Sequence, residues 1–116
     1  MCTRDDLDKI TIAVRDEALR IFAGKLNSVI LYGSYARGDN DSESDIDLML
    51  LIDITAETFN GYRSEIAKIS SRLSLETDDC VTISVALQDL KTFEKYKEIL
   101  PYYRNVVSEG IAIYAA

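Results

Sequence analysis

Residues 33–47 hold several side chains that could do chemistry together. Within this one segment the chain places Gly33, Ser34, Arg37, Asp45 and Asp47. A glycine lets a backbone approach a ligand closely, and the planar guanidinium of an arginine matches the oxygens of a phosphate. Paired carboxylates are ligands for hard divalent cations such as magnesium. This combination is typical of a site that binds a metal ion and a phosphate group.

The first half of the motif is a glycine-serine turn. Gly33 and Ser34 follow the apolar run SVILY and precede about one helical turn, YAR. A helix N-terminus after such a turn offers backbone N–H groups and a positive dipole end to a phosphate. The alternative is an ordinary turn that Ser34 caps, with Arg37 pairing to Asp39 or Glu43 on the surface.

The second half is the triplet Asp45-Ile46-Asp47. On a β-strand, residues i and i+2 point to the same face with Cα atoms about 6.5 to 7 Å apart, so both carboxylates would project together. Two carboxylates at that spacing can share one or two divalent ions. The alternative is a strand that merely begins with solvated acids. Because neither alternative predicts the other half of the motif, we interpret the two halves as one metal–triphosphate site on adjacent strand ends.

The elements that must position this segment follow from hydrophobic periodicity. Residues 4–24 place apolar side chains at helical spacing, and Gly24 is a plausible stop. Short apolar runs predict strands at 28–32 and about 45–52, and alternation predicts a strand at 81–87. Further helices are expected at 57–74, from the N-cap Asp89 to about Leu100, and from Pro101 to Gly110, with IAIY as a final strand or a tail. The order predicts a mixed α/β domain in which helices cover a small sheet.

The composition of the chain argues against some classes of function. The 116 residues carry a net charge of −7 and no histidine, which argues against binding to a nucleic-acid backbone and excludes a histidine-based triad or a histidine-ligated zinc. The absence of a long apolar run and of a secretory h-region predicts a soluble, cytoplasmic protein that forms one domain over residues 1–116. We expect Cys2 and Cys80 to be free thiols.

The motif also resembles a known family. GSYARG followed by SDIDL is similar to the GSxARG and SDxDL signature of the minimal nucleotidyltransferases (MNT), small members of the DNA polymerase β-like superfamily. The resemblance extends over essentially the whole chain, including the EG-containing C-terminal tail. It implies the polymerase β-like fold, a small mixed sheet flanked by helices. It also implies the transfer of a nucleoside monophosphate from a nucleoside triphosphate such as ATP to an acceptor hydroxyl, assisted by Mg²⁺.

The resemblance assigns a role to each motif residue. Gly33 and Ser34 would hold the β- and γ-phosphates, Arg37 would stabilise their charge, and Asp45 and Asp47 would be the catalytic, magnesium-binding carboxylates.

One departure from the family pattern concerns a third carboxylate. The superfamily usually supplies this group from a later strand, where it helps bind metal and activates the attacking hydroxyl. In this chain Thr82 stands where we expect that acid, and a threonine is neither a general base nor a strong magnesium ligand. Asp78 or Asp79 could take the role, or could be solvated turn residues.

The resemblance also implies a partner, typically a helical HEPN protein. In such pairs the HEPN chain is an RNase toxin, and the nucleotidyltransferase is the antitoxin that adds AMP to one of its tyrosines. Two alternatives stay open, namely a weak or inactive module that blocks a HEPN partner sterically, and transfer to a small molecule such as an aminoglycoside. The acceptor, the nucleotide base and the oligomeric state, homomeric or heteromeric, are not determined by the sequence.

Overall fold

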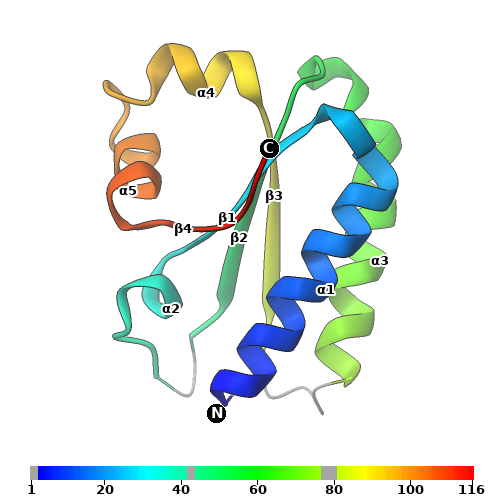
Figure 1. Ribbon diagram of the computed structural model, residues 1–116, viewed down its shortest axis with the longest axis vertical. Helices are drawn as coiled ribbons and strands as arrows, with labels where there is room; N and C mark the ends of the chain where they lie inside the picture. The colour runs from blue at the N-terminus through cyan, green and yellow to red at the C-terminus, as the bar shows by residue number, and fades with distance from the viewer. Residues whose placement is uncertain (1–2, 42–43, 77–80) are drawn as a thin grey trace.

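A computed structural model describes residues 3–41, 44–76 and 81–116 (Figure 1). The helices are α1 (Arg4–Phe22), α2 (Ser34–Arg37), α3 (Asn60–Glu76), α4 (Leu90–Tyr96) and α5 (Pro101–Glu109), with short 3-10 turns at Ala23–Lys25 and Ala56–Thr58. The strands are β1 (Leu26–Tyr32), β2 (Ile46–Ile52), β3 (Ile83–Asp89) and β4 (Ile111–Ala115). No helix in the described part of the chain is both long enough and apolar enough to span a membrane.

The four strands form one mixed sheet in the order β3-β2-β1-β4. Strand β1 runs antiparallel to both β2 and β4, whereas β2 and β3 are parallel and are connected through α3. Parallel neighbours need such a long crossover connection, which α3 supplies. The mixed α/β fold predicted from the sequence is confirmed.

Helices cover both faces of this sheet (Figure 1). Helices α1 and α3 bury one face, where Leu48, Leu50 and Ile52 of β2 pack in the main core. On the other face Met49 and Leu51 pack with Phe93 of α4 and Val106 of α5 in a smaller cluster. The unbroken apolar run at residues 48–52 of β2 follows from this arrangement, because a segment covered on both faces has no solvent-facing position to fill with polar residues.

Several expected boundaries shift by one to four residues. The first helix ends at Phe22 rather than at Gly24, and its C-cap is Ala23 with a φ of 49°. Strand β1 starts earlier than 28, β2 starts at Ile46 rather than at Asp45, and β3 occupies 83–89 rather than 81–87. The third helix lies at 60–76 rather than 57–74, and α4 ends at Tyr96 rather than near Leu100. Pairing with neighbouring strands decides these strand limits, and periodicity alone does not reveal it.

The local signals in the last third of the chain are confirmed. The side chain of Asp89 caps α4 by accepting a hydrogen bond from the N–H of Thr92. Pro101 opens α5 and Gly110 is its C-cap. Residues 111–115 form the edge strand β4. The free-thiol prediction for Cys2 and Cys80 lies outside the described residues.

Gly110 connects α5 to β4 at a point where the chain has no room for a side chain. A Cβ at this position would overlap the carbonyl oxygen of Val106 and lie 2.6 Å from Cγ2 of Ile30. We expect Gly110→Ala to lower the free energy of unfolding by about 1–3 kcal/mol, the usual cost of overpacking. Urea denaturation measures this change. Gly24→Ala is the matched control, because a Cβ at Gly24 meets nothing within 4 Å. A Gly110→Ala variant as stable as Gly24→Ala would contradict the packing described here.

Candidate functional site

The register between β1 and β2 brings the two halves of the motif together. Tyr32, the last residue of β1, pairs with Asp47 of β2, so the turn that follows β1 starts beside this carboxylate. Gly33 has a φ of 76° and a ψ of −157°, a combination that essentially only glycine adopts. A Cβ at Gly33 would lie 2.5 Å from Oδ2 of Asp47. Glycine is therefore required here both by the backbone conformation and by the close approach of the carboxylate.

The carboxylates of Asp45 and Asp47 repel each other at the start of β2. Asp45 is exposed, just before the strand, and Asp47 is half-buried. Burial raises the pKa of Asp47, the charge of Asp45 raises it further, and the guanidinium of Arg37 lowers it. A carboxyl group whose pKa is raised by folding is most destabilising at neutral pH, where it is ionised. A bound cation would relieve this repulsion.

This donor set fits magnesium that arrives with a nucleotide. Among the described residues, no group of three or more acidic, cysteine or histidine side chains is arranged around a metal position. Magnesium does not need such a group, since it is usually bound through one or two carboxylates together with substrate phosphates and water. Asp45 and Asp47 could supply the protein's share of the ligands, and the phosphates would supply the rest.

Gly33 and Ser34 begin the single helical turn α2. The backbone N–H groups of Ala36 and Arg37 donate to the carbonyl oxygen of Gly33, at 3.1 Å each. This turn places Ser34 and Arg37 at the same end of the sheet as Asp47, below α5 (Figure 1). The structure thus brings together the five residues that the sequence singles out, although their chemical roles stay predictions.

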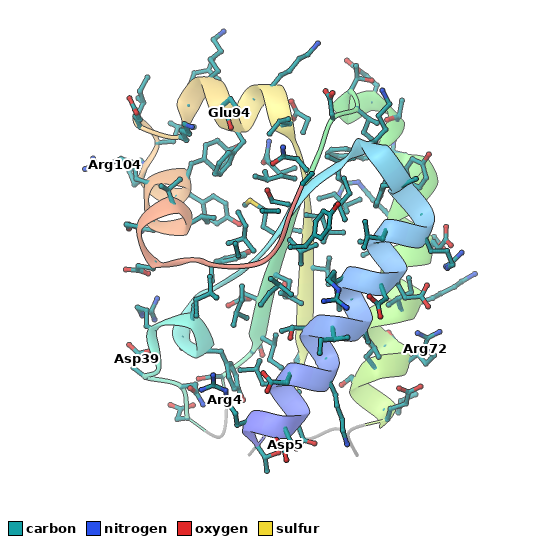
Figure 2. All side chains as sticks on the ribbon, in the orientation of Figure 1. Arg4, Asp5, Asp39, Arg72, Glu94 and Arg104 are labelled. Atoms are coloured by element: carbon teal, nitrogen blue, oxygen red, sulfur yellow. The ribbon has the colours of Figure 1, made fainter. Side chains whose placement is uncertain are left out.

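Arg37 is held by two surface ion pairs. Its Nε donates to Asp39 at 3.1 Å, and its Nη1 donates to Glu109 at the end of α5 at 3.2 Å. Asp39 lies at the outer edge of the segment after α2 (Figure 2). The sequence indicated Asp39 as a partner but not Glu109, which lies 72 residues away along the chain. The other partner considered, Glu43, lies outside the described residues.

Two hydroxyl side chains stand beside the carboxylate pair, Thr82 directly before strand β3 and Ser84 within it. The N–H of Ile46 donates to the carbonyl of Thr82, and Ser84 is the register partner of Asp47. Because side chains two residues apart share a face, Thr82 and Ser84 flank the two aspartates. The sequence places both hydroxyls on one polar face and Thr82 at the position expected for the acid, whereas the register sets Ser84 directly beside Asp47. Asp78 and Asp79, considered as substitutes for the third carboxylate, lie outside the described residues.

A pair of tyrosines borders the site on the side of α5. The hydroxyl groups of Tyr32 and Tyr102 lie 2.8 Å apart, and their rings meet edge to face. Burial is the main reason that the pKa of Tyr32 is raised; the hydrogen bond to Tyr102 and the charge of Asp47 contribute. The sequence gives no signal for this pair, because 70 positions separate the two residues and only the fold brings them together.

The amino-acid sequence matches a known protein family and is similar to named relatives. The family model described as nucleotidyltransferase domain matches residues 13–113. A protein of Methanocaldococcus jannaschii, provisionally named a protein adenylyltransferase, is 31% identical over 93 residues, which cover 80% of this chain and 83% of that protein. Another protein of the same organism with the same provisional name is 40% identical over 72 residues, covering 62% of this chain and 71% of that protein.

Two solved structures contain chains with a similar fold. A chain in a crystal structure of a toxin–antitoxin pair with AMP-PNP superposes with a TM-score of 0.56 at 19% identity, covering 94% of this chain and 73% of that chain. A chain in the complex of a tri-AMPylated HEPN toxin with an MNT antitoxin from Shewanella oneidensis gives a TM-score of 0.50 at 18% identity, with coverage of 94% and 73%. At these identities the likeness shows the fold.

The close approach of Gly33 to Asp47 generates a testable prediction. We expect Gly33→Ala to abolish magnesium-dependent binding of AMP-PNP, because the new Cβ must displace the Asp47 carboxylate. Calorimetric titration of AMP-PNP in the presence of Mg²⁺ measures this loss.

Gly38→Ala is the matched control for this prediction. Gly38 also has a positive φ, 81°, but a Cβ at this position meets nothing within 4 Å. The control should lose about 1–2 kcal/mol of stability to backbone strain and still bind the nucleotide. Equal binding by both variants would show that the contact between Gly33 and Asp47 is not part of the site.

Proposed function

Because this chain belongs to the nucleotidyltransferase domain family, we propose that it is an antitoxin that transfers AMP from ATP to a tyrosine of a HEPN toxin. The observation that carries the proposal is the Asp47 carboxylate lying against Gly33, which joins a metal-binding strand to a phosphate-binding turn. Two relatives with the provisional name protein adenylyltransferase support a protein acceptor. The fold shared with chains of toxin–antitoxin complexes supports the HEPN partner.

The residues of the site divide the work of binding the triphosphate. Asp45 and Asp47 hold magnesium, which when bound neutralises charge on the phosphates and on the departing pyrophosphate. The turn at Gly33 and Ser34 binds the β- and γ-phosphates through backbone N–H groups and a hydroxyl. Arg37 exchanges its surface partners for phosphate oxygens. The protein therefore acts by positioning and electrostatic stabilisation, which supply most of the catalysis in phosphoryl transfer.

The acceptor tyrosine provides the nucleophile. Its oxygen attacks the α-phosphorus, the bond to the β-phosphate breaks, and pyrophosphate leaves. An unperturbed tyrosine has a pKa of about 10, so the proton must be lost during the reaction. Neither Thr82 nor Ser84 can accept this proton at neutral pH. We therefore expect slower turnover than in an enzyme with a third carboxylate.

Transfer to a partner is tested by mass spectrometry. The chain is incubated with Mg²⁺, ATP and the HEPN protein encoded beside its gene. We expect the HEPN protein to gain one or more AMP units on tyrosine, and Asp45→Asn/Asp47→Asn to abolish the gain by removing the metal ligands. Asp53→Asn is the matched control, because Asp53 is exposed at the opposite end of β2.

The other outcomes of this experiment separate the alternatives. A tight complex without any mass gain would contradict the enzymatic proposal and favour a steric binding module. Pyrophosphate release that needs an aminoglycoside and leaves the HEPN protein unmodified would favour a small-molecule acceptor.

The register of β3 predicts where a third carboxylate would act. Ser84→Asp places an acid directly beside Asp47, whereas Thr82→Asp places one beside Asp45. Without metal, each variant should melt at a lower temperature than the unmodified protein, because it adds a like charge. Magnesium should restore stability more strongly in Ser84→Asp, because the added charge then lies beside the half-buried Asp47, whereas Thr82→Asp adds its charge beside the exposed Asp45. Thermal melting across a magnesium titration measures this difference. If the variants respond no more to magnesium than the unmodified protein, the metal does not lie between β2 and β3.

A further inference from the structure

The neighbourhood of the carboxylate pair includes an exposed tyrosine that the proposed function does not use. Along the face of the sheet that carries Asp47, the paired residues of β1 and β2 form successive rungs, with Ile30 opposite Met49 and Tyr32 opposite Asp47. Helix α5 covers this face, and its Val106 belongs to the same cluster as Met49. The next rung, two residues further along each strand, contains the catalytic carboxylate and Tyr32.

Tyr102 stands above this second rung. Its hydroxyl lies 2.8 Å from the hydroxyl of Tyr32. Side chains directly opposite each other in an antiparallel pair have Cβ atoms about 4.5–5.5 Å apart, so Tyr32 is the immediate neighbour of Asp47. The register and this hydrogen bond together lead from Asp47 through Tyr32 to the hydroxyl of Tyr102.

Exposure distinguishes Tyr102 from the adjacent tyrosine. Tyr103 turns inward, where its ring packs on Phe93 and its hydroxyl donates to Gln88 at 2.9 Å. Tyr102 keeps 48% of its surface exposed, although it also touches the rings of Tyr32 and Tyr103. Its hydroxyl is thus held in place by one neighbour and remains accessible to solvent.

We propose that Tyr102 is a self-modification site, at which the enzyme transfers AMP from ATP to the hydroxyl of its own Tyr102. This inference rests on the proposed nucleotidyl transfer but needs no partner protein. The acceptor class is the same, a tyrosine hydroxyl, and here the fold supplies it from α5 at the border of the site.

The reaction balances without any further reactant. The Tyr102 oxygen attacks the α-phosphorus of ATP and forms a new O–P bond. The bond between the α-phosphorus and the oxygen that bridges to the β-phosphate breaks, and pyrophosphate leaves with the electron pair. The phenolic proton passes to the water that reaches the exposed hydroxyl. The products are adenylylated Tyr102, pyrophosphate and a proton.

The modification is tested with the purified protein alone. The chain is incubated with Mg²⁺ and α-labelled ATP, and intact mass and peptide mapping locate any label. We expect one AMP unit on Tyr102, at a rate that does not depend on protein concentration because donor site and acceptor share one chain. Tyr102→Phe and Asp45→Asn/Asp47→Asn should each lose the label.

Two tyrosine variants serve as matched controls. Tyr96→Phe and Tyr103→Phe remove one hydroxyl each from the same part of the fold, and both should keep the label. Label on another residue, or label that survives Tyr102→Phe, would overturn the assignment. Transfer from a Tyr102→Phe chain to a separate Asp45→Asn/Asp47→Asn chain would overturn the intramolecular geometry.

A parallel reaction with the HEPN protein separates this inference from the proposed function. A modified HEPN protein together with an unmodified Tyr102 would overturn the inference and leave the proposed function standing. A modified Tyr102 with an unmodified HEPN protein would support the inference and contradict the proposed acceptor. The absence of both modifications would overturn both.

Discussion

The close approach of the Asp47 carboxylate to Gly33, which leaves no room for a Cβ, is the constraint on which the site depends. It exists only because β1 and β2 pair in the register that sets Tyr32 opposite Asp47. A shift by one residue would move every side chain of a strand to the other face, and the carboxylates would then point into the core beneath α1 and α3. The apolar residues that alternate with the aspartates prevent this shift, since Ile46 and Leu48 are fully buried in that core.

One face of the sheet is filled by the main core, whereas the other face contains the candidate site residues. The face under α1 and α3 is filled by the main apolar cluster. The opposite face is covered by α4 and α5 over only part of its length, where Met49 and Leu51 are buried. Beyond that cover the same face carries the two aspartates, Thr82 and Ser84. One short strand can therefore contain both fully buried core residues and carboxylates that solvent reaches, because α4 and α5 bury only part of this face.

Sequence patterns predicted those parts of the site that lie close together in the chain. Gly33 and the aspartates were identifiable by residue type, and the strands by their apolar runs. Contacts across strands were not predictable, because registers depend on pairing rather than on spacing. The position of Ser84 beside Asp47 follows from the register of a parallel pair whose connection spans α3. The bond between Tyr32 and Tyr102 joins residues 70 positions apart, and local periodicity contains no information on such a contact.

Helix α5 contacts residues of the candidate site at both of its ends, and one of these contacts holds Arg37. Near its start Tyr102 meets Tyr32, and at its end Glu109 pairs with Arg37. The ion pairs of Arg37 are exposed to solvent, and such pairs contribute at most about 1 kcal/mol each. A triphosphate bound with magnesium at Gly33 would offer Arg37 several charged oxygens at once, in the bidentate geometry that a guanidinium favours. Releasing Glu109 would therefore cost little, so the binding of a nucleotide to the proposed site would be sufficient to redirect Arg37 away from the end of α5.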